Sequence, residues 1–218
     1  SASAAAEAIS IAVGVGAEGL PAGVPMGDIG KFENLASAGV FVDSQATGID
    51  SGSGADTITN SGNITADASA NFWGGNLSLS LPLLEKWVPI PSPAFAMISA
   101  GTEVGAEAAG IRAGEGDDLI HNEGDLDVAA AASALNISTS MAFQGFVSDI
   151  NIVDIAAARA DAYTKADATA IGIDGGEGDD QIFNSGDITV DTTSEILSVA
   201  AAIAIQKNVK EAVNLEGT

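Results

Sequence analysis

The stretch GIDSGSGADTITNSGNI occupies residues 48–64, and the chain returns to it twice. It reappears as GIRAGEGDDLIHNEGDL at 110–126 and as GIDGGEGDDQIFNSGDI at 172–188. The two offsets are equal, 110 − 48 = 62 and 172 − 110 = 62, and no copy contains a gap. A long, fixed period is the sequence signature of structural units that stack on one another and bury their cores between neighbours.

The segments between these copies keep the same phase more loosely. Residues 1–8 fall in register with 63–70, and alanines at 100, 106 and 108 match alanines at 162, 168 and 170. We therefore treat 1–218 as one elongated domain of about 3.5 units. A partial unit covers 1–47, and further units start near 48, 110 and 172.

The local pattern predicts strands. Between residues 156 and 170, Ala and Thr occupy one parity, while Arg159, Asp161, Tyr163, Lys165 and Asp167 occupy the other. A period of two indicates a half-buried strand, and the Gly and Asn-x-Gly clusters indicate turns. The sequence thus predicts an all-β fold, a β-solenoid of the parallel β-helix or β-roll type. Sixty-two residues are long for one narrow coil, so we expect two coils of about 31 residues per unit, or three of about 20, stacked at about 4.8 Å.

Composition limits the function. Thirty Asp and Glu against seven Lys and Arg give a net charge of −23, which excludes nucleic acid as a partner because phosphate binding needs a basic surface. Aromatic residues make up only 5%, so small side chains in thin, closely stacked layers are expected. The chain has no Cys, hence no disulfide. The acidity suits divalent cations or a secreted, soluble surface, and we expect an extracellular or cell-surface location.

The segment GGEGDDQI at 175–182 fits the nonapeptide pattern G-G-x-G-x-D-x-U-x, and 113–120 and 51–58 fit it less completely. In these residues the chain resembles the RTX family of secreted, calcium-binding β-roll proteins. The resemblance implies calcium as cofactor, because glycine turns expose carbonyl oxygens and Asp adds a hard anionic ligand. The implied ligands are Asp56, Asp117, Asp118, Asp179, Asp180, Glu115 and Glu177.

The chain departs from that family in one respect. RTX nonapeptides occur in tandem, whereas here each occurs once per 62 residues. With two coils per unit, equivalent turns would lie about 9–10 Å apart, too far for one ion to be shared at ligand distances of about 2.3–2.6 Å. The alternative is that these are acidic Gly turns held by side-chain bonds to the backbone. Both interpretations stay open at this point.

The rest of the motif resembles the passenger repeats of autotransporters and filamentous bacterial adhesins. Asn60, Asn122 and Asn184 would then form a structural amide ladder. The single histidine, His121, aligns with Thr59 and Phe183, so the repeat does not require it. Nothing around Asp117 and Asp118 supplies the contrasting environments of an acid–base pair, so we expect no enzyme. A polysaccharide-active β-helix enzyme remains the third alternative.

Three sequons, at Asn63, Asn76 and Asn136, are candidate glycosylation sites. The aromatic and Pro-rich stretch 71–97 is the least regular part, and insertions of this kind often map to a binding face. Glu85, Lys86 and prolines interrupt its apolar run, so it is not a membrane span. We expect a structural or adhesive surface fibre that self-associates head to tail or laterally, with a surface or glycan as ligand, and with a calcium-triggered module as the alternative.

Overall fold

The computed structural model describes residues 1–18, 33–82, 94–143 and 156–205. Within these ranges the chain is all-β, and every strand pairs in parallel. Seven strands are 17 to 19 residues long, and three have only 4 residues. The prediction of an all-β fold is therefore confirmed, and parallel stacking is compatible with a β-solenoid.

The strands form three sheets. A four-stranded sheet has the order β1 (Ala2–Glu18), β4 (Ile64–Pro82), β7 (Leu126–Phe143) and β10 (Ile188–Ile205). A long three-stranded sheet has the order β2 (Glu33–Asp50), β5 (Ala94–Arg112) and β8 (Ala156–Asp174). A short sheet has the order β3 (Thr57–Asn60), β6 (Leu119–Asn122) and β9 (Gln181–Asn184).

The pairing register equals the sequence period. Ile64 pairs with Leu126, Leu126 pairs with Ile188, and 126 − 64 = 188 − 126 = 62. One unit thus contributes one strand to each sheet, which contradicts the prediction of two or three coils per unit. The physical reason is strand length: strands of 18 or 19 residues far exceed the usual mean of about 5–6, so two of them with a short strand and turns use up the whole unit in one circuit.

The first pairing differs slightly. Ala2 pairs with Ala66, an offset of 66 − 2 = 64, so the expected alignment of residues 1–8 with 63–70 is wrong by two residues. The pairing of β2 with β5 is back at 62, as between Ala38 and Ala100. Because the shift is an even number of residues, each side chain of β1 keeps its face of the sheet.

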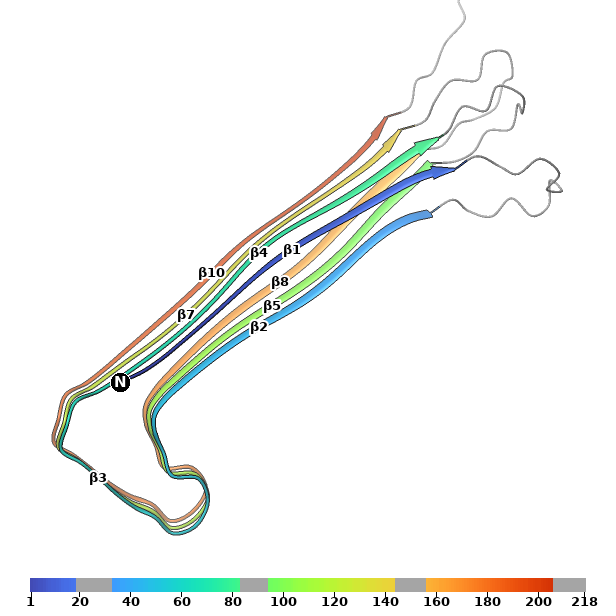
Figure 1. Ribbon diagram of the computed structural model, residues 1–218. Coiled ribbons are helices and arrows are strands. Elements are labelled where there is room, and N and C mark those ends of the chain that lie inside the picture. The colour runs from blue at the N-terminus through green and yellow to red at the C-terminus, as the bar shows by residue number, and fades with distance from the viewer. Residues whose placement is uncertain (19–32, 83–93, 144–155, 206–218) are drawn as a thin grey trace, which may run out of the picture.

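The two long sheets pack face to face. In Figure 1 the strands of the four-stranded sheet run away from the end that carries β3, and those of the long three-stranded sheet run back toward it. We call the end next to the short sheet the turn end and the opposite end of the long strands the far end. The core between the sheets at the turn end is mostly Ala, Val and Ile, including buried Ala66, Ala68, Val104, Ala106 and Val128. Small inward side chains allow the two backbones to approach closely.

The long Ala-rich stretch is a strand. Residues 156–170 lie within β8, and Ala162, Thr164 and Ala166 are less exposed than Tyr163 and Lys165 between them. The period-two pattern therefore outweighs the intrinsic helix preference of alanine, because only a strand can bury every second residue against the facing sheet.

Candidate functional site

The Gly-rich turns stack directly on one another at the turn end. Gly114 has φ of 101° and Gly116 has φ of 129°, a region that side chains rarely adopt. A Cβ on Gly114 would overlap the carbonyl oxygen of Gly52, and a Cβ on Gly116 would overlap that of Gly54. Both the backbone angle and the contact with the turn below therefore require glycine, and the equivalent glycines of the other two copies also have positive φ.

Backbone hydrogen bonds join successive turns. Gly54 donates its N–H to the Glu115 carbonyl at 2.7 Å, and Glu115 donates to the Gly52 carbonyl at 3.0 Å. Gly116 repeats the first bond to Glu177 at 2.7 Å. Equivalent turns are thus direct neighbours, one strand spacing of about 4.8 Å apart. The expected separation of 9–10 Å is wrong, because it assumed two coils per unit.

Asp56, Asp118 and Asp180 form a ladder inside these turns. Asp118 Oδ1 accepts the backbone N–H of Asp56 at 2.7 Å, and Asp180 Oδ1 accepts that of Asp118 at 2.9 Å. Asp118 is only 2% exposed. The Oδ2 atoms of Asp56 and Asp118 are buried and have no hydrogen-bond partner among the described residues. The Asp118 carboxylate therefore fastens the neighbouring turn through Oδ1, and its Oδ2 accepts no hydrogen bond from the described residues.

The remaining acids that the resemblance selected lie at the surface. Asp117, Asp179, Glu115 and Glu177 are exposed. Asp117 Oδ1 accepts the backbone N–H of Asp179 at 3.0 Å. This side-chain bond to a turn backbone is the alternative to calcium binding that the sequence left open. Ser53, Glu115 and Glu177 are joined by parallel backbone bridges, so these two Glu residues follow the stacking of the turns.

In the described part of the chain, no three His, Cys, Asp or Glu side chains gather closely enough to hold a metal ion. Calcium needs about 6–8 oxygen ligands. The Gly52 and Gly114 carbonyls already accept backbone N–H groups from the next turn. The Oδ2 atoms of Asp56 and Asp118 are the buried acidic oxygens of these turns that accept no hydrogen bond from the described residues.

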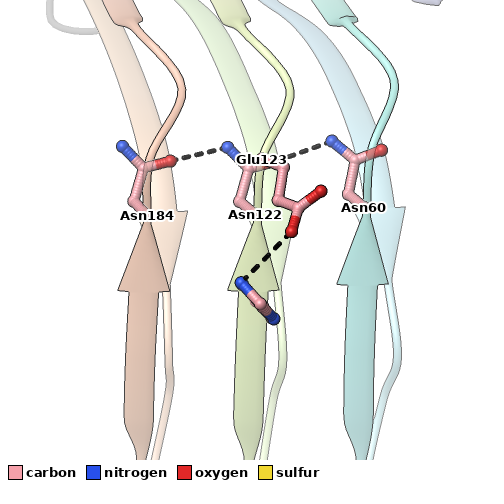
Figure 2. A network of polar contacts seen from close by, with 5 residues as sticks. Asn60, Asn122, Glu123 and Asn184 are labelled. Atoms are coloured by element: carbon pink, nitrogen blue, oxygen red, sulfur yellow. Dashed lines mark hydrogen bonds and ion pairs between the residues drawn. The ribbon is translucent and has the colours of Figure 1, made fainter.

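The amide ladder is present, as Figure 2 shows. Asn60 Nδ2 donates to Asn122 Oδ1 at 2.6 Å, and Asn122 Nδ2 donates to Asn184 Oδ1 at 2.6 Å. Each Nδ2 also donates to the carbonyl of the glycine two residues later, at 2.7 Å. The bonds thus tie each short strand both to its own turn and to the neighbouring unit. This prediction is confirmed.

The histidine lies outside this ladder. His121 is stacked between Thr59 and Phe183 in the short sheet, as the repeat alignment predicts. Its Nε2 lies 3.6 Å from the Glu123 carboxylate, and its side chain is 51% exposed. It therefore has the environment of a surface residue, without a buried charge beside it.

The three sequons lie in different surroundings. Asn63 is exposed, and its Oδ1 accepts the Asp125 N–H at 3.3 Å. Asn76 is 7% exposed and Asn136 is fully buried, and both lie between the long sheets. Folding therefore withdraws Asn76 and Asn136 from any glycosylating enzyme, and only Asn63 of the three stays accessible.

The stretch 71–97 is more regular than expected. Residues up to Pro82 continue β4, and β5 begins at Ala94, while 83–93 lies outside the described residues. Phe72 faces inward at 3% exposure, and Trp73 faces outward at 62%. The expected irregular insertion is thus, in its described parts, the ends of two long strands.

A feature missed by sequence reasoning begins at Trp73. From there toward the far end, the inner positions of the two central strands, β4 and β7, are mostly polar, and the outer face of the sheet is mostly apolar. Asn76 Nδ2 lies 3.4 Å from Asn136 Oδ1, and Asn136 Nδ2 lies 3.4 Å from Thr102 Oγ1. The available signal was a change of parity: the apolar residues of β4 are even-numbered at Ala66–Ala70 and become odd-numbered at Trp73 and Leu77.

The fold and the turns define a class: an all-β protein whose parallel strands and Gly-Asp turns stack in register. A scan of protein-family models, a search of curated proteins and a search of solved structures each gave no match to this chain. The described residues contain no helix with the length and apolarity needed to cross a membrane.

Proposed function

We propose that this chain is a segment of an extracellular structural or adhesive fibre built as a β-solenoid. The observation that carries the proposal is the register: apart from β1 with β4, strands pair with their counterparts 62 residues later in all three sheets. Such stacking has no intrinsic end, because each unit offers the next one the same row of backbone groups.

The polar ladders support a role in building a long array. Asn60, Asn122 and Asn184 repeat one bond at the same 2.6 Å from unit to unit. The Asp ladder repeats in the same way at 2.7 and 2.9 Å. Buried polar ladders pin the register, because a slip would leave every member unpaired.

Charge and composition support the extracellular location. The net charge of −23 would keep a repetitive, strand-rich surface soluble outside the cell. Most acids of the turns are exposed, and Asp117, Asp118 and Asp180 accept backbone N–H groups, an arrangement suited to structure more than to acid–base chemistry.

The test is growth along the stacking direction. Inserting further copies of 110–171 directly after residue 171, where they keep the 62-residue phase, should lengthen the particle by about 4.8 Å per copy in small-angle X-ray scattering. Aligned fibres should diffract at about 4.8 Å along their axis. A particle that grows in another direction, or inserted copies that stay unfolded, would contradict the proposal. Surface labelling of intact source cells with an antibody tests the location.

The second candidate function is a calcium-dependent module, favoured by the buried, unpartnered Oδ2 atoms of Asp56 and Asp118. The decisive variant is Asp118→Asn, since its Oδ1 can still accept the Asp56 N–H while the second oxygen is lost. The matched control is Asp125→Asn, because exposed Asp125 also accepts a backbone N–H, from Asp187 at 3.1 Å.

If calcium holds the turns, millimolar Ca²⁺ should raise the melting temperature of the native chain relative to EDTA. The rise should disappear in Asp118→Asn and persist in Asp125→Asn. Equal melting temperatures with Ca²⁺ and with EDTA would show that hydrogen bonds stabilise the turns without calcium.

A further inference from the structure

The outer face of the four-stranded sheet is divided into two halves of opposite character. At the turn end it carries exposed acids on each strand, Glu7, Asp67, Asp127, Asp191 and Glu195. At the far end its outward positions are mostly apolar, across all four strands. We call the outward-facing residues within 9–13, 73–79, 135–141 and 197–205 the apolar face.

The register lines these residues up in rows across the sheet. Ile9 pairs with Trp73, Trp73 with Leu135, and Leu135 with Leu197. Two residues further on, Ile11, Ile137 and Val199 fall in one row. Large side chains on this face are well exposed, for example Ile9 at 80%, Trp73 at 62% and Leu197 at 59%.

The interior beneath the apolar face does not need these side chains. Asn136, Ser138 and Ser140 are fully buried on the inner side of β7, and Ser140 Oγ donates to the Ala96 carbonyl at 2.7 Å. The sequence therefore puts polar residues inside and large apolar residues outside along the same strand. This arrangement reverses the usual burial of apolar residues, so we expect a second apolar surface to cover the exposed side chains.

The size of the apolar face fits a modest interface. The four strands contribute six residue steps on average, and steps of about 3.3 Å with a strand spacing of about 4.8 Å give about 20 Å by about 19 Å, or about 380 Å² in projection. A standard interface buries about 800 Å² per partner, so one chain supplies about half of that area and its pairing should be weak and reversible. Each additional unit would add about 95 Å², because one more strand joins the sheet.

The charge of the chain indicates which partner covers the apolar face. The described outer face of this sheet carries no Lys or Arg, and the chain has a net charge of −23. Segments that lie on membranes usually combine apolar residues with Lys and Arg, and anionic lipids would repel this chain. A second copy offers an apolar face of the same size with the same row spacing of about 4.8 Å, so the side chains of two copies can interdigitate.

We propose that the apolar face pairs with the apolar face of a second copy, with the strands of the two copies antiparallel across the contact. A two-fold axis near Ala201 then sets Leu197 opposite Ile205 of the partner subunit. In this orientation the acidic halves point away from each other, whereas a parallel pair would put the acidic half of one copy against the acidic half of the other.

A hollow fits this orientation. It has a volume of about 480 Å³, lies beside Trp73, Leu135 and Leu197, and borders Glu195 at the edge of the apolar face. The two-fold axis would bring Ile205 of the partner subunit over it. This pairing rests on the proposed function, since it is the lateral association of two fibres. It uses sheet faces, while growth of one fibre uses strand edges, so the two can fail separately.

The test is the oligomeric state in solution. We expect a reversible dimer in sedimentation velocity at micromolar concentrations. The double variant Ile137→Glu/Val199→Glu should weaken dimerisation by about a hundredfold or more, because pairing would bury unpaired carboxylates. The matched control is Phe41→Glu/Tyr163→Glu, on the outer face of the other long sheet at 69% and 58% exposure, which should dimerise as the native chain does.

Circular dichroism of both variants checks that the strands are retained. A native chain that is monomeric at every concentration would overturn the proposal, as would a folded Ile137→Glu/Val199→Glu chain that still dimerises. A monomer that floats with phosphatidylcholine vesicles, and loses this binding in the same variant, would assign the face to lipid instead. Dimers without fibres in the scattering test would leave the pairing intact and refute the fibre.

The orientation has its own test, since the chain has no cysteine. A short bismaleimide should cross-link Ala201→Cys into a dimer, because the residue lies next to the two-fold axis and facing sheets are about 10 Å apart, beyond the reach of a disulfide. Thr193→Cys, an outward residue of the same strand in the acidic half, should remain unlinked. Cross-linking of Thr193→Cys without Ala201→Cys, or equal cross-linking of both, would overturn the proposed antiparallel arrangement.

Discussion

The turn end and the far end of the molecule both contain buried asparagines, but they use them differently. At the turn end Asn122 bonds to Asn60 and Asn184 at 2.6 Å. At the far end the contact between Asn76 and Asn136 is 3.4 Å, and Asn76 Oδ1 has no partner among the described residues. At the turn end, short bonds repeat because the sequence repeats, whereas the sequence of the far end varies from unit to unit. The pairing register is therefore fixed at the turns, and the residues of the far end can form a contact surface.

The largest effect should come from the stacked turns. Gly116→Ala should lower the free energy of unfolding by at least about 2 kcal/mol, because a side chain at this φ is strained and its Cβ would overlap the Gly54 carbonyl. Gly39→Ala is the control, since nothing lies within 4 Å of its added Cβ. Urea unfolding measures both, and equal midpoints for the two variants would mean that the turns are not tightly stacked.

The two asparagine sites give the next comparison. Asn122→Ala should cost about 1–3 kcal/mol, since it removes the short bonds of a buried amide to Asn60, Asn184 and the Gly124 carbonyl. Asn136→Ala should cost less, because its contacts are 3.4 Å or longer. Thermal unfolding of the two variants provides the measurement. A larger loss at Asn136 would reverse the assignment of register to the turn end.

A smaller effect separates the two inner layers of β7. Ala132→Ser should cost about 1–2 kcal/mol, because it puts a hydroxyl into the Ala-lined half at a position only 1% exposed. Ser138→Ala should change stability by less than about 1 kcal/mol, since its hydroxyl accepts from Asn76 Nδ2 at 3.4 Å and donates to Asn136 Oδ1 at 3.5 Å, both long contacts. If denaturant unfolding gave similar losses of unfolding free energy for the two variants, the Ala-lined half and the polar half of β7 would tolerate a change of polarity equally.

The smallest effect concerns the outer face of the long three-stranded sheet, which carries ion pairs in place of apolar rows. The hydrogen bond from Lys165 to Asp167, together with the charge of that carboxylate, raises the pKa of Lys165 above its ordinary value. Because the folded-state pKa is raised, any stabilisation is present below the ordinary lysine pKa and is lost as pH rises through the folded value. Asp167→Asn should lower the Lys165 pKa in an NMR titration and leave the melting temperature at neutral pH unchanged.

Much of the fold followed from the sequence, for identifiable reasons. The 62-residue spacing predicted stacked units, and Asn60, Asn122 and Asn184 predicted the amide ladder. The number of coils per unit was wrong, since a period gives the distance between paired residues but not how many strands lie between them. The period-two run through 156–170, which has no turn signal, was the best clue to strands long enough for one circuit.

The candidate site was predictable only in part. Asp118 was selected by its place after a glycine turn, but the separate roles of its two oxygens depend on the neighbouring turn, which sequence spacing misplaced. The apolar face was missed because alternation looks equally regular on either parity. The signal that distinguishes the core from the exposed surface is the change of parity in β4. Ala70 is even-numbered and faces inward, whereas Trp73 is odd-numbered and faces outward.

The central claim is that equivalent residues of successive units are direct neighbours, and a pair of engineered cysteines tests it most directly. Thr59→Cys/His121→Cys places two exposed cysteines on adjacent strands about 4.8 Å apart, within the range for a disulfide. Thr59→Cys/Phe183→Cys, two units apart, would span about 9.6 Å and should not close. Non-reducing mass spectrometry of the monomer should find the disulfide only in the first chain. An open first pair in the folded chain, or a closed second pair, would contradict one circuit per unit.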